Sequence, residues 1–307
     1  MKISIIGAGN VGGCAALRIA QEELGDVFLL DIAPGLAKGK AYDLEDAVSL
    51  TGKPYRITGS EDMNSLADSD IVVITAGLAR KPGMTREDLL AKNAAITGSV
   101  CRFISDKAKK AIVVIVTNPL DAMTWYAGKL LGFPSSRVFG MGLTLDSARF
   151  ANLIGKTLGL PATQIDAPVI GAHGEGMLPL SRLSRVAGKP FNEIIPEADK
   201  RQTLEKRVIE RGKEIVSLLG SGSAYFAPSA AICQMVKAIA NDEKSPLAAS
   251  CLLKGEYGIS GICLGVPCII GRNGVEKIIE LDLNTAELKI LKDSAEAIRQ
   301  LNALIKI

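Results

Sequence analysis

The 307-residue sequence is poor in histidine and in aromatic residues. It contains one His and one Trp, and aromatic side chains make up 4% of the chain. The 36 Lys and Arg residues are spread along the sequence and nearly balance the 33 Asp and Glu residues, leaving a net charge of +3. Without a basic patch or interleaved aromatics, the composition gives no sign of a nucleic-acid-binding surface. Because there is one imidazole, any histidine chemistry must occur at a single position.

Long apolar runs are also missing from the sequence. No run approaches the roughly 20 residues that a helix needs to cross a bilayer. The N-terminus enters an apolar strand over residues 2–6 without the charged region, apolar region and cleavage site of a signal peptide. We therefore expect a cytoplasmic protein without a membrane association.

Cysteines are present but are not arranged as metal ligands. The six Cys residues are scattered in apolar surroundings, and the closest spacing is that of Cys263 and Cys268. There is no Cys-X-X-Cys pair and no second ligand cluster. We expect reduced, packed thiols and no metal site.

Short apolar runs alternate with helical patterns through the first half of the chain. The expected strands lie over residues 2–6, 27–31, 55–58, 71–75, 111–117 and 138–139. Most segments between them are long enough for crossover helices, as over 10–21 and 85–108. Continuous apolar strands joined by helices predict the doubly wound parallel sheet of a Rossmann fold, covered on both faces.

The pattern changes near residue 143. Helices are expected over 144–157, 197–219 and 228–240, strands over 165–170, 259–270 and 276–283, and a hairpin-like pair around 187–190. Asn284 with Glu287 resembles a capping box at the start of a last helix. No linker or repeat separates the halves. We predict an α/β class chain, with a dinucleotide-binding domain over 1–142, an α+β substrate domain over 143–307, and a broad interface between them.

A glycine-rich turn, Gly7-Ala8-Gly9-Asn10-Val11-Gly12, lies between the first expected strand and the first expected helix. Its glycines allow a tight bend, a close approach to a pyrophosphate, and close packing of helix on strand. The helix N-terminus then offers N–H groups to the anion. Asp31 ends the next strand about 20 residues further on, where a carboxylate accepts ribose hydroxyls and repels a 2′-phosphate. The pattern predicts NAD rather than NADP, although Lys38 and Lys40 lie nearby.

The single histidine, His173, lies between glycines just beyond an expected strand. Its ordinary pKa of about 6.5 lets it give and take a proton near neutrality. Reduction of a carbonyl by hydride requires such a proton donor. Asp146 and Arg149 share one face of the helix that opens the second half, where Asp146 would orient the imidazole and Arg149 would grip a carboxylate. A solvated ion pair on the helix surface is the alternative interpretation.

A basic loop over residues 77–86 follows the fourth expected strand and contains Arg80 and Arg86. The carboxyl ends of strands in a doubly wound sheet face the ligand crevice, and glycines at both ends suit a loop that closes over substrate. Two arginines on such a loop favour a substrate rich in carboxylate oxygens. Asn118, after the fifth expected strand, would present its amide to cofactor or substrate.

Taken together, these motifs resemble the lactate/malate dehydrogenase family, most closely its malate dehydrogenases of lactate-dehydrogenase-like type. The resemblance covers essentially the whole chain. It rests on GAGNVG (7–12), Asp31, GLARKPGMTREDLL (77–90), TNPLDAM (117–123), LDSARF (145–150), GAHGEGMLPL (171–180) and GSGSAYFAPSAA (220–231). Two sites differ from the family's usual pattern. Glu175-Gly176 stands where Asp and a small hydroxyl residue are usual, and Leu143-Thr144 where Gly-Val is usual.

The resemblance implies a role for each motif residue. His173 would be the proton donor and acceptor with Asp146 as its partner, and Arg149 would bind the carboxylate beside the reacting carbon. Arg86 would polarise the carbonyl oxygen as the loop closes, and Asn118 would contact substrate. The residues implied in NAD binding are Gly7, Ala8, Gly9, Asn10, Val11, Gly12, Asp31, Asn93, Val116, Thr117 and Asn118.

Arg80 decides which substrate is expected. By the same resemblance, family members that take a dicarboxylate place an arginine there, and lactate enzymes place a glutamine. Pyruvate would leave Arg80 desolvated and unpaired, at a cost of about 2–5 kcal/mol, whereas oxaloacetate would pair with it. The resemblance therefore implies reversible, NAD-dependent oxidation of (S)-malate to oxaloacetate, a reaction of the tricarboxylic acid cycle, in a homotetramer built from dimers.

Three other functions fit part of the pattern. A lactate or other 2-hydroxyacid dehydrogenase would share the chemistry, but Arg80 disfavours it. An NAD-dependent glycosidase, a hydrolase, would also combine a Rossmann half with hydride chemistry, but it needs a metal held by Cys and His, and no Cys lies beside His173. A non-catalytic NAD sensor would leave the catalytic motif residues without a purpose.

Overall fold

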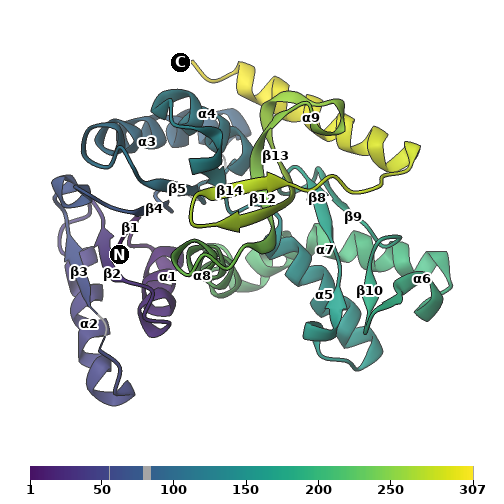
Figure 1. Ribbon diagram of the computed structural model, residues 1–307, viewed down its shortest axis with the longest axis horizontal. Coiled ribbons are helices and arrows are strands. Elements are labelled where there is room, and N and C mark those ends of the chain that lie inside the picture. The colour runs from purple at the N-terminus through teal and green to yellow at the C-terminus, as the bar shows by residue number, and fades with distance from the viewer. Residues whose placement is uncertain (55, 79–83, 307) are drawn as a thin grey trace.

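The computed structural model describes residues 1–54, 56–78 and 84–306. Its first half is built on six parallel strands in the spatial order β3-β2-β1-β4-β5-β6 (Figure 1). These are β1 (Lys2–Ile6), β2 (Asp26–Leu30), β3 (Ile57–Ser60), β4 (Ile71–Ile74), β5 (Ile112–Ile115) and β6 (Val138–Gly140). The predicted doubly wound sheet is confirmed. The strand order reverses between β1 and β4, and ligands of such sheets bind at this switch point, beyond the carboxyl ends of the strands.

Helices cover both faces of this parallel sheet (Figure 1). α1 (Asn10–Gln21) lies on one face beside α8 (Phe226–Ala240), which comes from the second half of the chain. α3 (Arg86–Lys107) and α4 (Leu120–Leu131) pack together on the other face, and α2 (Leu36–Thr51) runs along β3. Burial on both faces explains why the strands are continuous runs of Ile and Val.

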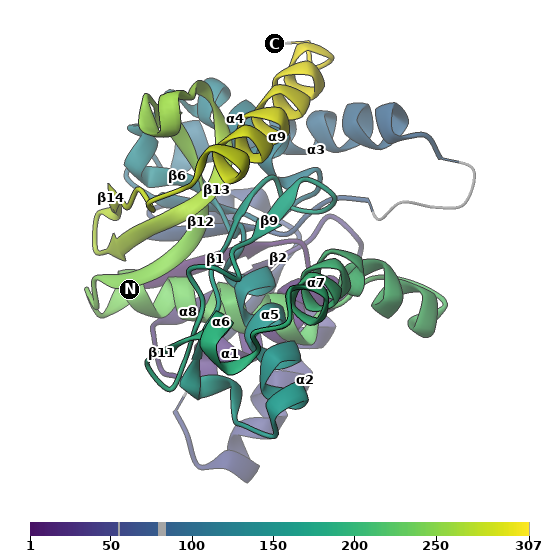
Figure 2. The same cartoon turned by 90° about the vertical axis from the view of Figure 1, so that its right-hand side faces the viewer.

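The second half continues the same sheet with antiparallel strands. Its elements are α5 (Thr144–Leu158), β7 (Ile165–Asp166), β8 (Val169–Gly171), β9 (Met177–Pro179), β10 (Arg185–Val186), β11 (Lys189–Pro190), α6 (Phe191–Ile194), α7 (Ala198–Leu219), α8, β12 (Ser245–Lys254), β13 (Ser260–Gly271), β14 (Gly274–Ile278) and α9 (Thr285–Ala303). β12 joins β6 where Ser250 pairs with Gly140, and β13, β8 and β9 follow in order. α9 lies against β13, β8 and β9 (Figure 2). One sheet therefore runs through both halves.

Three sequence-based expectations for the second half were wrong or incomplete. The strand expected over 165–170 is two strands, β7 and β8, because Pro168 between them has no N–H for a sheet ladder. The strand expected over 276–283 begins earlier and ends at Ile278. β12 was not expected, since its Pro246-Leu247-Ala248-Ala249-Ser250 segment has little of the β-branched character of a strand.

The predicted start of the last helix is confirmed in detail. Asn284 is the N-cap of α9, and its side chain accepts from the Glu287 N–H at 2.9 Å. The Glu287 carboxylate in turn accepts from the Asn284 N–H at 2.9 Å. These two bonds satisfy backbone donors that a helix end would otherwise leave unpaired.

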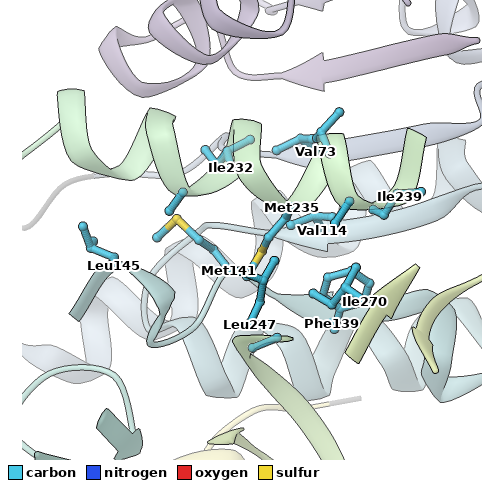
Figure 3. Close-up of a cluster of buried hydrophobic side chains, with 14 of the residues drawn as sticks. Val73, Val114, Phe139, Met141, Leu145, Ile232, Met235, Ile239, Leu247 and Ile270 are labelled. Carbon is cyan, nitrogen blue, oxygen red and sulfur yellow. The ribbon is translucent and has the colours of Figure 1, made fainter. Parts of the chain in front are cut away.

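A large apolar cluster crosses from one half of the chain to the other. Ile232, Met235 and Ile239 of α8 pack on the side of the sheet that carries Val73 and Val114 (Figure 3). The same cluster continues through Phe139, Met141, Leu145, Leu247 and Ile270. Each fully buried side chain of this size contributes about 1.5–3 kcal/mol. The cluster therefore holds the two halves in a fixed relation.

Within the described residues, no helix combines the length and apolar character needed to cross a bilayer. In the same part of the chain, no group of three or more His, Cys, Asp or Glu residues is placed to hold a metal ion. All six cysteines are free thiols; five are buried and Cys14 is half-buried. Burial raises the pKa of Cys101 to about 12 and that of Cys233 to about 11, so both carry their protons near neutrality.

Candidate active site

The glycine-rich turn joins β1 to α1 and is packed tightly. Gly7 has a φ of +106°, a conformation that favours glycine, and its N–H donates to the Leu30 carbonyl at 2.7 Å. A Cβ on Gly12 would overlap the Gly7 carbonyl oxygen, so α1 approaches β1 this closely because residue 12 is glycine. A Cβ on Gly9 would meet nothing within 4 Å. The turn therefore has open space beside its second glycine, where a pyrophosphate would lie.

The N-terminus of α1 and Asp31 border this open space. Gly9 is the N-cap of α1, which has no side-chain cap and no acidic residue in its first turn. Its N–H groups and positive dipole end thus suit an anion. The Asp31 carboxylate accepts from the Ala8 N–H at 2.6 Å and from the Ala33 N–H at 2.9 Å. These bonds fix Asp31 beside the turn and leave lone pairs for ribose hydroxyls.

Asn93, which the resemblance assigns to NAD binding, is fully buried and bonded within the chain. Its Oδ1 accepts from the Leu78 N–H at 2.8 Å, and its Nδ2 donates to the carbonyls of Leu78 and Asn118, at 3.2 and 2.6 Å. Asn93 thus ties the start of the 77–86 loop to the end of β5. Both N–H groups of this amide are used within the chain, so only the second lone pair of Oδ1 is left for a cofactor.

The segment after β5 contains three further predicted residues. Val116 is half-buried, and Thr117 is buried with its hydroxyl donating to the Ala76 carbonyl at 2.7 Å. Asn118 is exposed and precedes a cis peptide bond to Pro119. Of the three, Asn118 has the side chain that is open to a ligand.

The structure brings His173, Asp146 and Arg149 together. His173 lies in the turn between β8 and β9, and Asp146 is in the first turn of α5. His173 Nδ1 and Asp146 Oδ2 are 2.7 Å apart, and Arg149 Nη1 donates to Asp146 Oδ1 at 2.8 Å. Asp146 is fully buried, whereas the side chains of His173 and Arg149 are 18% and 12% exposed. Arg149 Nε is a buried donor, and it has no hydrogen-bond partner among the residues that the structure describes.

The electrostatics of this group favour a protonated imidazole. Burial alone would lower the pKa of His173, but the charge and hydrogen bond of Asp146 outweigh it and raise that pKa above its ordinary value. Burial alone would raise the pKa of Asp146, but His173 and Arg149 hold it below its usual value. Asp146 is therefore charged near neutrality. It engages Nδ1 of His173 and leaves Nε2 to exchange a proton.

Two residues of the site had no role in the sequence analysis. Asp121, in the first turn of α4, is 2% exposed, and Ser250 of β12 is fully buried. Asp121 Oδ1 accepts from the Ser250 hydroxyl at 2.6 Å, and its Oδ2 accepts from the backbone N–H of His173 at 2.8 Å. The TNPLDAM motif contained Asp121, but nothing in the sequence distinguished it from an ordinary acidic residue in a first helical turn. Ser250 lies in the unexpected strand.

The unusual residues beside His173 have partners elsewhere in the fold. Glu175 forms an ion pair of 2.6 Å with Lys213 of α7. A Cβ on Gly176 would lie 2.9 Å from Ser294 Oγ of α9, which accepts from the Ala172 N–H at 2.9 Å. A hydroxyl therefore supports this turn, but α9 supplies it instead of residue 176.

The unusual pair at the start of α5 is also accommodated. Leu143 is fully buried against β13. A Cβ on Gly265 of β13 would lie only 2.7 Å from Leu143 Cγ, so Leu143 fits because residue 265 is glycine. Thr144 Oγ1 donates to the Ala248 carbonyl at 2.9 Å and accepts from the Ala248 N–H at 3.0 Å. The pair thus attaches α5 to β12 and β13.

The predicted loop arginines are not placed. Arg80 lies outside the described residues. Arg86 is the first residue of α3, and its side chain is likewise outside the description.

Comparison with known proteins relates both halves of the chain to one family. Residues 1–140 match the NAD-binding domain of lactate/malate dehydrogenases, and residues 143–305 match their alpha/beta C-terminal domain. A protein of Methanosarcina mazei named malate dehydrogenase is 46% identical over 98% of this chain and 97% of its own length.

Solved structures of two activities share this fold. The malate dehydrogenase of Cryptosporidium parvum has a TM-score of 0.96 at 40% identity and covers 98% of both chains. The lactate dehydrogenase of that organism, solved with lactic acid and nicotinamide adenine dinucleotide, has a TM-score of 0.95 at 36% identity and covers 99% of this chain and 97% of its own.

The fold therefore does not separate the two activities, but it does identify the family and the cofactor. The match over residues 1–140 assigns NAD to the N-terminal half, and the open glycine turn with Asp31 at its edge fits that group. With both halves matched and relatives of this identity over nearly its full length, the chain belongs to the lactate/malate dehydrogenase family of NAD-dependent oxidoreductases.

Proposed function

We propose that this chain is a malate dehydrogenase, which oxidises (S)-malate to oxaloacetate reversibly with NAD. The contact that carries the proposal is the His173–Asp146–Arg149 group, with distances of 2.7 and 2.8 Å. The group contains an imidazole, a buried carboxylate and a guanidinium, which would exchange the proton, orient the imidazole and bind a substrate carboxylate. The 45–46% identical relatives named malate dehydrogenase support the substrate.

In the proposed mechanism, bound NADH would supply the hydride for the reacting carbon. Residues of the chain transfer the proton, stabilise the imidazolium and bind the substrate carboxylate. His173 Nε2 donates the proton to the carbonyl oxygen during reduction and accepts it during oxidation. Asp146 holds Nδ1 and stabilises the imidazolium. Arg149 binds the carboxylate beside the reacting carbon. Its buried, unpaired Nε, as judged within the described part of the chain, supports this role because such a donor is costly until a ligand pairs with it.

Substrate choice is proposed to depend on Arg80, with Arg86 polarising the carbonyl oxygen. Arg80 would pair with the second carboxylate of oxaloacetate, which pyruvate does not have. Asn118 would contact substrate, and the glycine turn, Asp31 and the Val116–Asn118 backbone would hold NAD. Asn93 would act through its braces to Leu78 and Asn118.

The experiment compares oxidation of NADH by equal concentrations of oxaloacetate and pyruvate, in wild type and in Arg80→Gln. We expect fast oxidation with oxaloacetate and almost none with pyruvate in wild type. The variant should move the ratio toward pyruvate by tens- to thousands-fold, because it lacks the guanidinium that bound pyruvate would leave desolvated and without a partner. An unchanged ratio would refute the role of Arg80. If the protein binds NADH, as shown by a change in NADH fluorescence, but turns over neither substrate, the proposed reaction is refuted.

We further propose a substrate domain that begins at residue 143, a homotetrameric assembly and a cytoplasmic location. The two family matches, over 1–140 and 143–305, support the boundary. Large apolar side chains left exposed in the single chain support association, because burial between subunits would remove them from water; they include Leu50, Leu218 and Phe226, at 88%, 80% and 64%. Light scattering of the purified protein measures the assembly directly.

A further inference from the structure

Asp121 links three elements around the histidine. It stands in the first turn of α4, in the dinucleotide-binding half. One carboxylate oxygen is bonded to Ser250 of β12 and the other to the backbone N–H of His173, at 2.6 and 2.8 Å. Because Asp121 is 2% exposed, both bonds are shielded from water and hold their geometry.

The contact reaches the main chain of His173, not its ring. Asp146 bonds the ring at Nδ1, so two buried carboxylates fix one residue from two sides. The backbone bond sets where the turn between β8 and β9 begins, and the ring bond sets how the imidazole is rotated. Both are needed to hold Nε2 at a defined point, and a displacement of about 1 Å can cost on the order of 100-fold in rate.

We propose that Asp121 is a positioning residue, oriented by Ser250, that fixes the backbone of His173 from the other half of the molecule. The kinetic part of this inference rests on the proposed function, in which His173 exchanges the proton. The contacts themselves join the two halves of the molecule beside His173. Ser250, which pairs with Gly140 of β6, is thus connected through Asp121 to the turn that contains His173.

The charges around His173 agree with this role. With Asp121 ionised, the carboxylates of Asp121 and Asp146 outnumber the one guanidinium of Arg149, and a protonated imidazole balances that charge. The charge of Asp121 also raises the pKa of His173, by less than Asp146 does. Burial raises the pKa of Asp121 itself, while the bonds from Ser250 and His173 oppose that rise. Other described groups near the turn include the Glu175–Lys213 ion pair and Ser294, and the Cys263 thiol, which burial keeps protonated, lies near Asp121.

The single histidine makes the test direct. In tag-free protein labelled with ¹³C-histidine, one imidazole signal reports one residue, and its titration gives the pKa without any turnover. Asp121→Asn keeps the shape and removes the charge. We expect the His173 midpoint to fall by about one pH unit. The falling limb of kcat/KM for oxaloacetate reduction should move to lower pH by the same amount, a loss of about ten-fold above the midpoint.

Two further variants separate positioning from ordinary structural support. Ser250→Ala keeps the Asp121 carboxylate and removes its orienting bond, so the midpoint should fall in the same direction by less. Asp242→Asn is the matched control, since Asp242 also accepts from a backbone N–H, that of Arg272 at 2.8 Å, away from the site. It should leave both readouts unchanged.

The outcomes decide the inference in each case. A folded Asp121→Asn protein with an unmoved imidazole midpoint would overturn it, whatever its thermal stability. Should that variant fail to fold, Ser250→Ala decides, and an unmoved midpoint there overturns the inference. If wild type is inactive on oxaloacetate but Asp121→Asn still lowers the His173 midpoint, the proposed function is overturned, whereas the effect of Asp121 on the imidazole titration stands.

Discussion

At the scale of single residues, the proton on His173 connects stability with chemistry. The pKa of His173 is raised in the folded chain, mainly because Asp146 outweighs the opposing effect of burial. A raised histidine pKa adds stability that is fully present below the unfolded value of about 6.5 and is lost as pH rises through the folded value. Proton donation during reduction requires the same protonated form. Reduction should therefore weaken at high pH, where this contribution to stability is also lost.

Replacing His173 tests whether it is the acid. His173→Asn should lower turnover by at least 100-fold, because general acid–base catalysis contributes about 100- to 10,000-fold, while NADH binding is retained. Steady-state kinetics measures the first quantity and NADH fluorescence titration the second. Near-normal turnover would exclude His173 as the proton donor.

Replacing Asp146 tests the orienting carboxylate. Asp146→Asn removes the charge that raises the pKa of His173, so the falling limb of the reduction profile should move to lower pH. It also frees the ring tautomer, which costs about 10,000-fold in serine proteases with an analogous carboxylate. We expect a loss of at least 100-fold in kcat, measured from pH 5 to 9. Glu175→Gln, on the exposed Lys213 ion pair, serves as the control for loss of a nearby charge. A small loss with an unmoved limb would contradict the role of Asp146.

At the scale of elements, helix ends determine what the chain can hold. α1 begins at Gly9 without a side-chain cap, whereas α9 begins with a complete capping box. An uncapped helix end leaves N–H groups for an anion, and a capped end satisfies them within the chain. At α1 these free N–H groups suit the pyrophosphate of the cofactor, whereas at α9 the capping box satisfies them within the chain.

The capping box of α9 should contribute measurable stability. Asn284→Ala removes the acceptor of the Glu287 N–H and should lower the free energy of unfolding by about 1 kcal/mol. Chemical denaturation of wild type and variant measures this difference. Asn192→Ala, an exposed residue of α6 outside any cap, is the control. No difference between the two variants would show that the box contributes nothing to the fold.

At the scale of the whole molecule, small residues allow the two halves to share one sheet. A Cβ on Gly140 of β6 would lie 2.5 Å from Thr124 Oγ1 and 2.9 Å from Ser250 Cβ of β12. The seam, where Gly140 of β6 pairs with Ser250 of β12, therefore leaves almost no room between the parallel and antiparallel parts of the sheet. It also adjoins the Ser250–Asp121 bond beside His173.

A methyl group at this seam should disturb both stability and catalysis. Gly140→Ala should cost about 1–3 kcal/mol, the usual penalty for overpacking, and lower kcat because Ser250 must shift. Gly128→Ala, in α4, is the matched control; its Cβ would meet nothing within 4 Å, and alanine favours a helix. Thermal melts and kinetics of both variants measure the effect. Equal behaviour of the two would show that the seam can relax.

The first half of this fold could be predicted well because its signals are local. β-branched runs, crossover lengths and the glycine turn specify β1 to β6 and α1 without long-range information. β12 could not be predicted, because its small residues fit the crowding against Gly140 and not any strand preference. Pro168 similarly divides a continuous-looking apolar strand.

The sequence by itself determined the residue types: one imidazole, an acidic and a basic partner at helical spacing, and a glycine turn followed by Asp31. Their chemistry is a property of side chains and short spacings. Only the tertiary structure decided that Asp121 contacts His173, that Ser250 bonds Asp121, and that Ser294 bonds the neighbouring Ala172 N–H. It also decided that Asn93 is a brace within the chain. Such contacts depend on how packed elements place atoms within about 3 Å, and no local pattern encodes that.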